Sequence, residues 1–302
     1  MASQTLVSST GITIMVPIFL RHRFINRMTQ LHIFLSSTWT SKFSSNKQFF
    51  LKVYPLFFHK ISIPIGCIII WECLIHFLQL PNYILPTPFE VLQSLINHGA
   101  LIGSQTLPTL AEILLGLSFG IILGVTIAIS MCLFRTLHTF LLPLLLASQA
   151  LPVFAIAPLL VLWFGYGVTA KIITTTFMLF FPVTNNFLDG LKQTPENYLN
   201  IAKIMNSSRW QILYQIRIPA ALPNLACGIR LATAMAPLGA IIGEWVGSNQ
   251  GLGFLLLNAN AQMQIDLMFA VLLVIFFLGI LLYYLVDTLI KLALPWTLLP
   301  SH

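Results

Sequence analysis

The sequence predicts an all-α fold, a polytopic bundle of about six membrane-spanning helices. Of its 302 residues, 57% are hydrophobic and only 8% are charged, whereas an ordinary soluble domain carries roughly 25% charged residues. Several apolar runs approach or exceed the roughly 20 residues that cross a bilayer. Basic residues gather between alternate runs, as they do in multi-pass membrane proteins. A soluble domain of this composition could not cover its surface, so we expect an integral membrane protein.

Residues 1–60 predict a poorly structured extension on the cytoplasmic side, or a chain start assigned too early. The apolar piece 11–20 is too short to span a membrane and contains Pro17. No basic segment precedes it, so it lacks the layout of a secretory signal.

The expected transmembrane domain covers residues 61–294, and residues 295–302 form a tail. Its expected spans are 61–80, 110–134, 140–164, 171–188, 222–246 and 267–294. The third span contains Pro143, Pro152 and Pro158, so we expect it to be kinked or broken.

Two spans carry a small residue at every fourth position. These rows are Gly116, Gly120, Gly124 and Ala128 in the second span, and Gly228, Ala232, Ala236 and Ala240 in the fifth. Small residues let helix backbones approach closely in a membrane. We favour tight packing within one chain over a dedicated dimer face.

The distribution of Lys and Arg predicts the orientation. With the N-terminus inside, nearly all of the 15 basic residues face the cytoplasm, and the segments 81–109 and 247–266, which would lie outside, contain none. The C-terminus and the polar segment 194–219 are then also cytoplasmic.

The segment 194–219 is the only long polar interval between spans. Thr194 can cap a helix that begins at Pro195. Tyr198, Ile201, Ala202 and Met205 then fall on one face of this helix.

After a break at Asn206, a second short helix carries Trp210, Leu213 and Tyr214 on one face, and Pro219 marks the entry into the next span. Such a pair of amphipathic helices either docks into a groove on a partner or lies as a solvated loop on the membrane surface.

This segment resembles the cytoplasmic EAA loop of bacterial ABC-importer permeases. The pattern there is E-A-A, three residues, G, nine residues and I-x-L-P. Here Asn200-Ile201-Ala202 takes the place of E-A-A, Asn206 that of Gly, and Ile216 to Pro219 that of the closing motif. The spacing matches, whereas the family's Glu is replaced by Asn200. Asn206 can replace Gly at a turn that needs a positive φ.

Residues 71–291 are similar to the nitrate/sulfonate/taurine-type importer permeases. The supporting stretches are PNYILPTP at 81–88, APLLVLWFGYG at 157–167 and PAALPNLACGIRLA at 219–232. The resemblance implies a type I ABC-importer fold in the bacterial inner membrane, a homodimer with a central path, two cytoplasmic ATPase subunits and a soluble binding protein outside. ATP-driven closure of the ATPases would move the loops and rock the spans between inward-open and outward-open states. The residues implied to contact or couple to the ATPase are Tyr198, Asn200, Ile201, Ala202, Met205, Asn206, Trp210, Leu213, Ile216 and Pro219.

The chain itself shows no catalytic chemistry. It has no G-x-x-x-x-G-K-[ST] phosphate loop, and its seven His and four Cys lack metal-ligand spacing. We therefore expect a transport subunit and not an enzyme, with no cofactor or metal of its own, ATP bound by the partner, and no nucleic acid.

Arg230 and Glu244 are the ionisable residues of the fifth span and the candidates for lining the path. For Glu244 we favour a structural role near the outer face, where Gly247, Gly251 and Gly253 predict a tight turn.

The segment 236–270 most resembles permeases assigned to hydroxymethylpyrimidine, a thiamine precursor, or a formylamino relative. Sulfonate, taurine, nitrate and riboflavin remain open as cargo. Two other classes of protein remain as alternatives. One is a transporter driven by an ion gradient, in which Glu112 and Glu244 would be the intramembrane acids and internal repeats would be typical. The other is a membrane-bound assembly protein without cargo.

Overall fold

The computed structural model describes residues 65–79 and 81–298, which form helices and turns and contain no strand. The chain divides into two units, 1–71 and 72–302, and only residues 65–71 of the first are described; they are helical. An apolar helix, Ile65–Leu78, occupies the first expected span. The extension expected over residues 1–60 lies outside the described residues.

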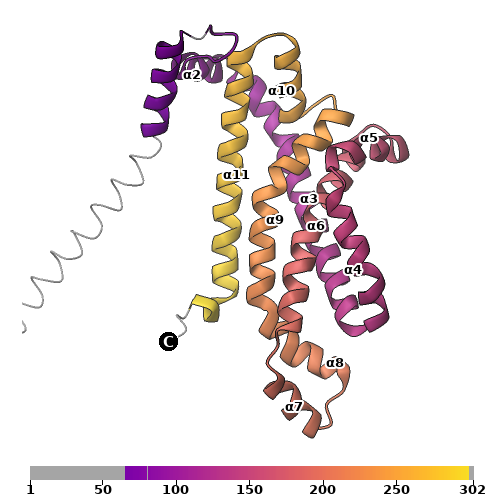
Figure 1. The fold of residues 1–302 in the computed structure, drawn as a ribbon. Helices are drawn as coiled ribbons and strands as arrows, with labels where there is room; N and C mark the ends of the chain where they lie inside the picture. Colours follow the sequence, from indigo (N-terminus) through magenta and orange to yellow (C-terminus); the bar gives the residue numbers. More distant parts are fainter. Residues whose placement is uncertain (1–64, 80, 299–302) are drawn as a thin grey trace, which may run out of the picture. The chain divides into compact units, whose positions relative to one another are not determined.

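Three long helices form the centre of the second unit (Figure 1). They are α3 (Gly99–Leu133), α6 (Val168–Lys192) and α9 (Ile218–Gly247), and α6 packs against both of the others. A fourth, α11 (Ile265–Ala293), packs against α9.

The rows of small residues face α6. A Cβ atom on Gly124 of α3 would lie 2.8 Å from the carbonyl oxygen of Phe180, and one on Gly228 of α9 would lie 2.9 Å from that of Pro182. Both distances are far inside van der Waals contact, so the backbones approach this closely only because a side chain is missing. Packing within one chain, the expectation from the sequence, is confirmed.

The third expected span is broken, as predicted. α4 (Arg135–Ala150) and α5 (Val153–Phe164) meet at an angle of 104°. The break falls at Leu151, whose ψ of 122° is extended, because a residue before proline is driven out of the helical region. Pro143 and Pro158 remain inside the two helices.

The segment 81–109, expected to be an outer loop, is largely helical. α2 (Pro88–Asn97) begins at a capping box formed by Thr87 and Glu90, and α3 begins at Gly99, eleven residues before the expected span. Thr87 caps α2, and Pro108 is tolerated inside α3. α2 packs against α11.

The described helices support a multi-pass membrane protein. Three of them, Gly99–Leu133, Arg209–Gly247 and Ile265–Ala293, are long and apolar enough to cross a bilayer, and the bent pair α4–α5 would make a fourth span. The 25-residue α6 has many Thr and Asn residues, and much of it is buried. The expected count of six spans is therefore approximate. The short 3-10 helix η2 (Pro295–Leu298) follows α11.

Candidate functional site

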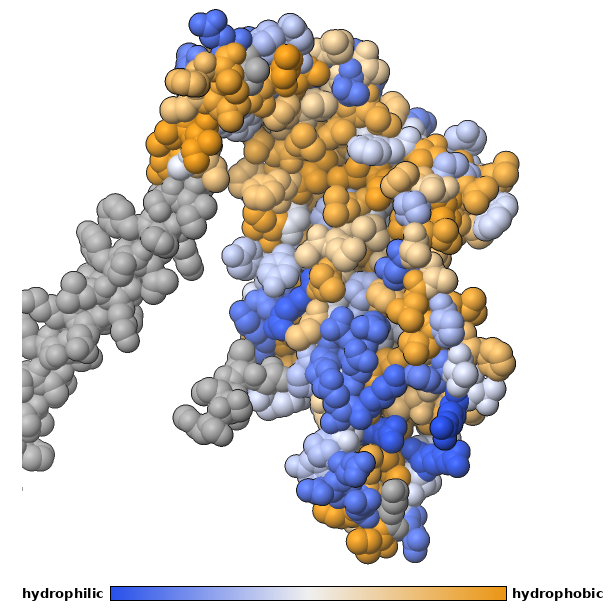
Figure 2. All heavy atoms as spheres, viewed as in Figure 1, coloured by the Kyte–Doolittle hydropathy of each residue, from blue (hydrophilic) through white to orange (hydrophobic). Residues whose placement is uncertain are grey.

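The polar loop forms one end of the second unit (Figure 1). It contains α7 (Glu196–Ile204), α8 (Arg209–Ile212) and η1 (Leu213–Arg217), a π-helical turn that continues directly into α9. Asn206, between α7 and α8, has a φ of 52°, the left-handed conformation that asparagine tolerates. Ser208 and Gln211 form a capping box at the start of α8. Hydrophilic residues gather toward this end of the molecule, with apolar atoms among them (Figure 2).

The apolar side chains of the loop point in two directions. Ala202 and Leu213 are buried, Leu213 with only 1% of its surface exposed, and Leu213 belongs to a cluster with Phe187, Leu191 and Ala221. Six other large apolar residues of the loop are more than half exposed: Tyr198 (58%), Ile201 (55%), Ile204 (83%), Met205 (73%), Trp210 (59%) and Tyr214 (69%). Two buried side chains thus anchor the loop, and these six project from it.

The other loop residues singled out in the sequence lie at its surface or partly within it. Asn200, Asn206 and Pro219 are exposed, and Ile216 is half-buried. Leu213, expected to contact the partner, instead lies in the base of the loop. The sequence could not show this, because Trp210 and Leu213 share a face at helical spacing.

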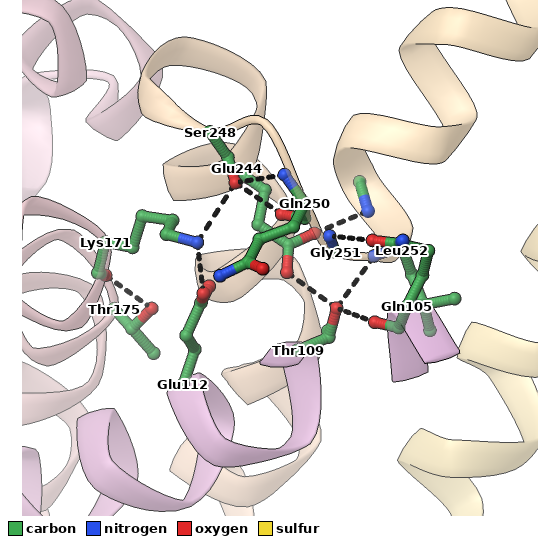
Figure 3. Close-up of polar contacts among 11 residues, drawn as sticks. Gln105, Thr109, Glu112, Lys171, Thr175, Glu244, Ser248, Gln250, Gly251 and Leu252 are labelled. Carbon is green, nitrogen blue, oxygen red and sulfur yellow. Dashed lines mark hydrogen bonds and ion pairs between the residues drawn. The ribbon is translucent and has the colours of Figure 1, made fainter. Parts of the chain in front are cut away.

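Three buried charged residues form a cluster (Figure 3), and one of them, Glu244, lies near the end of α9 that is farther from the loop along the chain. Glu112 comes from α3, Lys171 from α6 and Glu244 from α9, and each side chain is at most 2% exposed. Lys171 Nζ forms an ion pair with Glu112 and lies 3.0 Å from Ser248 Oγ. The cluster joins the three central helices through one ammonium group and two carboxylates.

Glu244 holds the turn between α9 and α10 (Leu252–Ala261). Its carboxylate accepts hydrogen bonds from Thr109 Oγ1 at 2.6 Å and from the backbone N–H of Gly253 at 2.5 Å. Thr109 Oγ1 in turn accepts from the N–H of Leu252 at 2.8 Å. The first turn of α10 is therefore tied to both α3 and α9.

Gly251 allows this arrangement. Its φ is 113°, a region that residues with a side chain avoid. A Cβ atom there would overlap the carboxylate of Glu244. The N–H of Gly251 donates to Gln105 Oε1 at 2.6 Å, so the turn gains a further bond to α3.

Arg230 lies in a separate ion cluster between α9 and α11. Its Nε is 2.7 Å from Asp287 Oδ1, and Lys291 Nζ is 2.6 Å from Asp287 Oδ2. Arg230 and Glu244 are fourteen positions apart on one helix, about 21 Å along its axis, so the structure does not bring these two candidates together.

Sequence reasoning missed the partners of these ions. Lys171 is simply the first residue of the fourth expected span, 171–188, and the sequence pattern does not single out Asp287. The i, i+4 spacing of Asp287 and Lys291 is a usable signal; the pairing of Lys171 with Glu112 depends on which helices are neighbours.

The part of the chain that the structure describes contains no group of three His, Cys, Asp or Glu residues placed to hold a metal ion. Its four cysteines are all free.

Comparison with known proteins gives the family. The family described as "Binding-protein-dependent transport system inner membrane component" matches residues 116–297. A "Probable ABC transporter permease protein" of Haemophilus influenzae is 47% identical over 74% of this chain and 91% of its own length. The "Formylaminopyrimidine transport permease protein" of Halalkalibacterium halodurans is 36% identical over 76% of this chain and 91% of its own.

Solved structures agree at the level of the fold. An inward-facing structure of the MetNI methionine ABC transporter has a TM-score of 0.57 at 18% identity, covering 65% of this chain and 97% of that chain. The type I importer fold expected from the sequence is thereby confirmed.

Proposed function

The chain belongs to the family of binding-protein-dependent transport system inner membrane components, and from this premise we propose that it imports a small uncharged pyrimidine, a precursor of thiamine. As a member of this family, the chain is the permease subunit of an ABC importer, a multi-pass protein of the inner membrane that serves transport. The family implies two kinds of partner, an ATPase and a binding protein. We place ATP on the ATPase subunit.

The polar loop is the docking surface for that ATPase in this proposal. The observation that carries it is the set of exposed apolar side chains, Tyr198, Ile201, Met205 and Trp210, held on a buried base. Large apolar side chains that project from a polar loop are typical of a surface that fits a groove on a partner. The loop and both chain termini are then cytoplasmic.

Two copies of the chain form the translocation path in this proposal. The bent pair α4–α5 exposes many large apolar residues, among them Phe140, Leu162 and Trp163, which lipid or a second copy would cover. Closure of the ATPases would move the loops and switch the path between inward-open and outward-open states.

The cargo is proposed from one relative and one electrostatic argument. The relative named for formylaminopyrimidine transport covers 76% of this chain. Arg230, the candidate for the path in α9, donates its Nε–H to Asp287, so its guanidinium is less free to bind a sulfonate through paired hydrogen bonds than an unpaired one would be. For Glu244 we propose a structural role, because it holds the turn before α10.

Co-purification tests the docking surface. Replacement Trp210→Asp places a charge in the apolar contact and should abolish recovery of the ATPase with the tagged permease. Tyr83→Asp is the matched control, because Tyr83 is similarly exposed at 65% and lies outside the loop. Full recovery of the ATPase with Trp210→Asp would reject the assignment.

Uptake by the assembled importer, with its binding protein, tests the cargo. Accumulation of labelled formylaminopyrimidine, with no competition from taurine, is the expected result. Accumulation of taurine instead would reject the pyrimidine and favour the sulfonate class.

A further inference from the structure

A small pocket lined by two arginines lies beside the polar loop. Its volume is about 240 Å³. It lies between the last turn of α3 and the helices α8 and η1, and its lining residues are Cys132, Leu133, Arg209, Ile212, Leu213 and Arg217. One part of the wall is therefore basic and the other apolar.

The arginines of this pocket lack an anionic partner. Arg217 Nη1 donates to Cys132 Sγ at 3.1 Å, and a thiol is a weak acceptor. The Nε atom of Arg217 is buried and has no hydrogen-bond partner among the described residues. Neither Arg217 nor Arg209 forms an ion pair within the described part of the chain. Because burying a charge without a partner is costly, the pocket is suited to an anion.

We propose that this pocket binds the phosphate group of an anionic phospholipid. Guanidinium groups match phosphate oxygens through paired, charge-assisted hydrogen bonds. Basic pockets at the cytoplasmic ends of membrane-spanning helices are recognition sites for such headgroups. The apolar residues Leu133 and Ile212 would pack against the glycerol and the start of the acyl chains. The cytoplasmic placement rests on the proposed function of the loop.

The position of the pocket at the end of a membrane-spanning helix favours a lipid headgroup over a carboxylate of the ATPase as its ligand. Cys132 and Leu133 belong to the membrane-spanning helix α3 and end it. The next residue, Phe134, is 60% exposed, as expected for a side chain that meets lipid at the edge of the hydrocarbon. The pocket is also next to the π-helical turn η1, and such turns are frequent at functional sites.

Native mass spectrometry of the full chain, purified without the ATPase, tests this proposal. Phosphatidylglycerol, titrated against phosphatidylcholine, should be retained selectively. Arg217→Gln should weaken that retention about tenfold or more, since a hydrogen bond to a charged group contributes about 1.5–3 kcal/mol. Arg209→Gln, at an exposed side chain, should weaken it in the same direction and carries little risk to folding. Lys192→Gln is the matched control: it removes one exposed positive charge in the last turn of α6 that does not line the pocket.

Each other outcome rejects the lipid. Equal retention by Arg217→Gln and the unsubstituted chain would show that the pocket binds no headgroup. Displacement of phosphatidylglycerol by millimolar inorganic phosphate would assign the site to the free anion. Absence of lipid, with loss of ATPase recovery in Arg217→Gln, would assign it to an acidic group of the ATPase. Because retention is measured on the permease alone, it remains informative even if Trp210→Asp leaves ATPase docking intact.

Discussion

Replacing Lys171 with Met should destabilise the permease strongly. The substitution keeps an unbranched side chain that is one heavy atom shorter and removes the ammonium group that pairs with Glu112 and reaches Ser248. Two carboxylates would remain, each at most 1% exposed, with no cation beside them. Breaking a buried ion pair from one side costs about 3–5 kcal/mol.

For a chain of this size, that loss corresponds to a lower unfolding temperature by about 6–20 °C. The assay is fluorescence-detected size-exclusion chromatography of detergent-solubilised protein after heating. The double variant Lys171→Met with Glu112→Gln removes the orphaned charge as well and should recover a large part of the loss. The control Lys291→Met removes a half-exposed lysine from a different ion pair and should change stability by about 1 kcal/mol or less.

An unchanged unfolding temperature for Lys171→Met would refute the reasoning. Loss of stability without recovery in the double variant would mean that the contact with Ser248, or the packing of the lysine stem, carries the effect instead of the charge.

Three further predictions concern the loop and the turn before α10. Gly251→Ala should lower expression of folded protein, because it combines an unfavourable φ with overlap on Glu244; wild-type yield on size-exclusion chromatography would contradict this. Glu244→Gln should cost about 1–3 kcal/mol of stability, because Thr109 and Gly253 donate to different carboxylate oxygens and the NH2 group of an amide cannot accept at the second position. Transport per folded molecule should stay near wild type, and complete loss of transport in stable protein would assign Glu244 to the path. Asn206→Gly should leave the recovery of the ATPase unchanged and the stability within about 1 kcal/mol of wild type. The reason is that Asn206 has an exposed side chain and a left-handed backbone, which glycine also adopts. A large loss of recovery would reveal a contact through the amide.

Local patterns in the sequence predicted much of the fold. The break of the third span follows from Leu151 and Pro152, because the restriction before proline acts between neighbours in the chain. The close packing of the rows of small residues could be predicted because these residues recur at every fourth position. The left-handed turn could be predicted at Asn206 because asparagine tolerates that conformation. Each of these features depends on a few adjacent residues.

The features that were missed depend on neighbours in space. Whether Lys171 meets Glu112 is decided by the packing of α6 on α3, which no spacing along one helix reveals. Likewise, Leu213 turned inward because the base of the loop supplies Phe187 and Leu191. The helices within 81–109 were missed because a search for long apolar runs does not detect a short capped helix or a span that begins with polar residues.

The helical stretch from Arg209 to Gly247 runs for 39 residues, which at 1.5 Å per residue is about 58 Å. It starts beside Trp210 on the exposed loop and ends three residues after Glu244, with no loop residue between α8 and α9. No loop interrupts this stretch, which contains the π-helical turn η1 and the internal prolines Pro223 and Pro237, so we expect a tilt imposed at the loop to be passed along it toward the turn before α10. One continuous helical stretch thereby connects the two ends of the permease. A flexible insertion near Arg217 should uncouple them without unfolding either end.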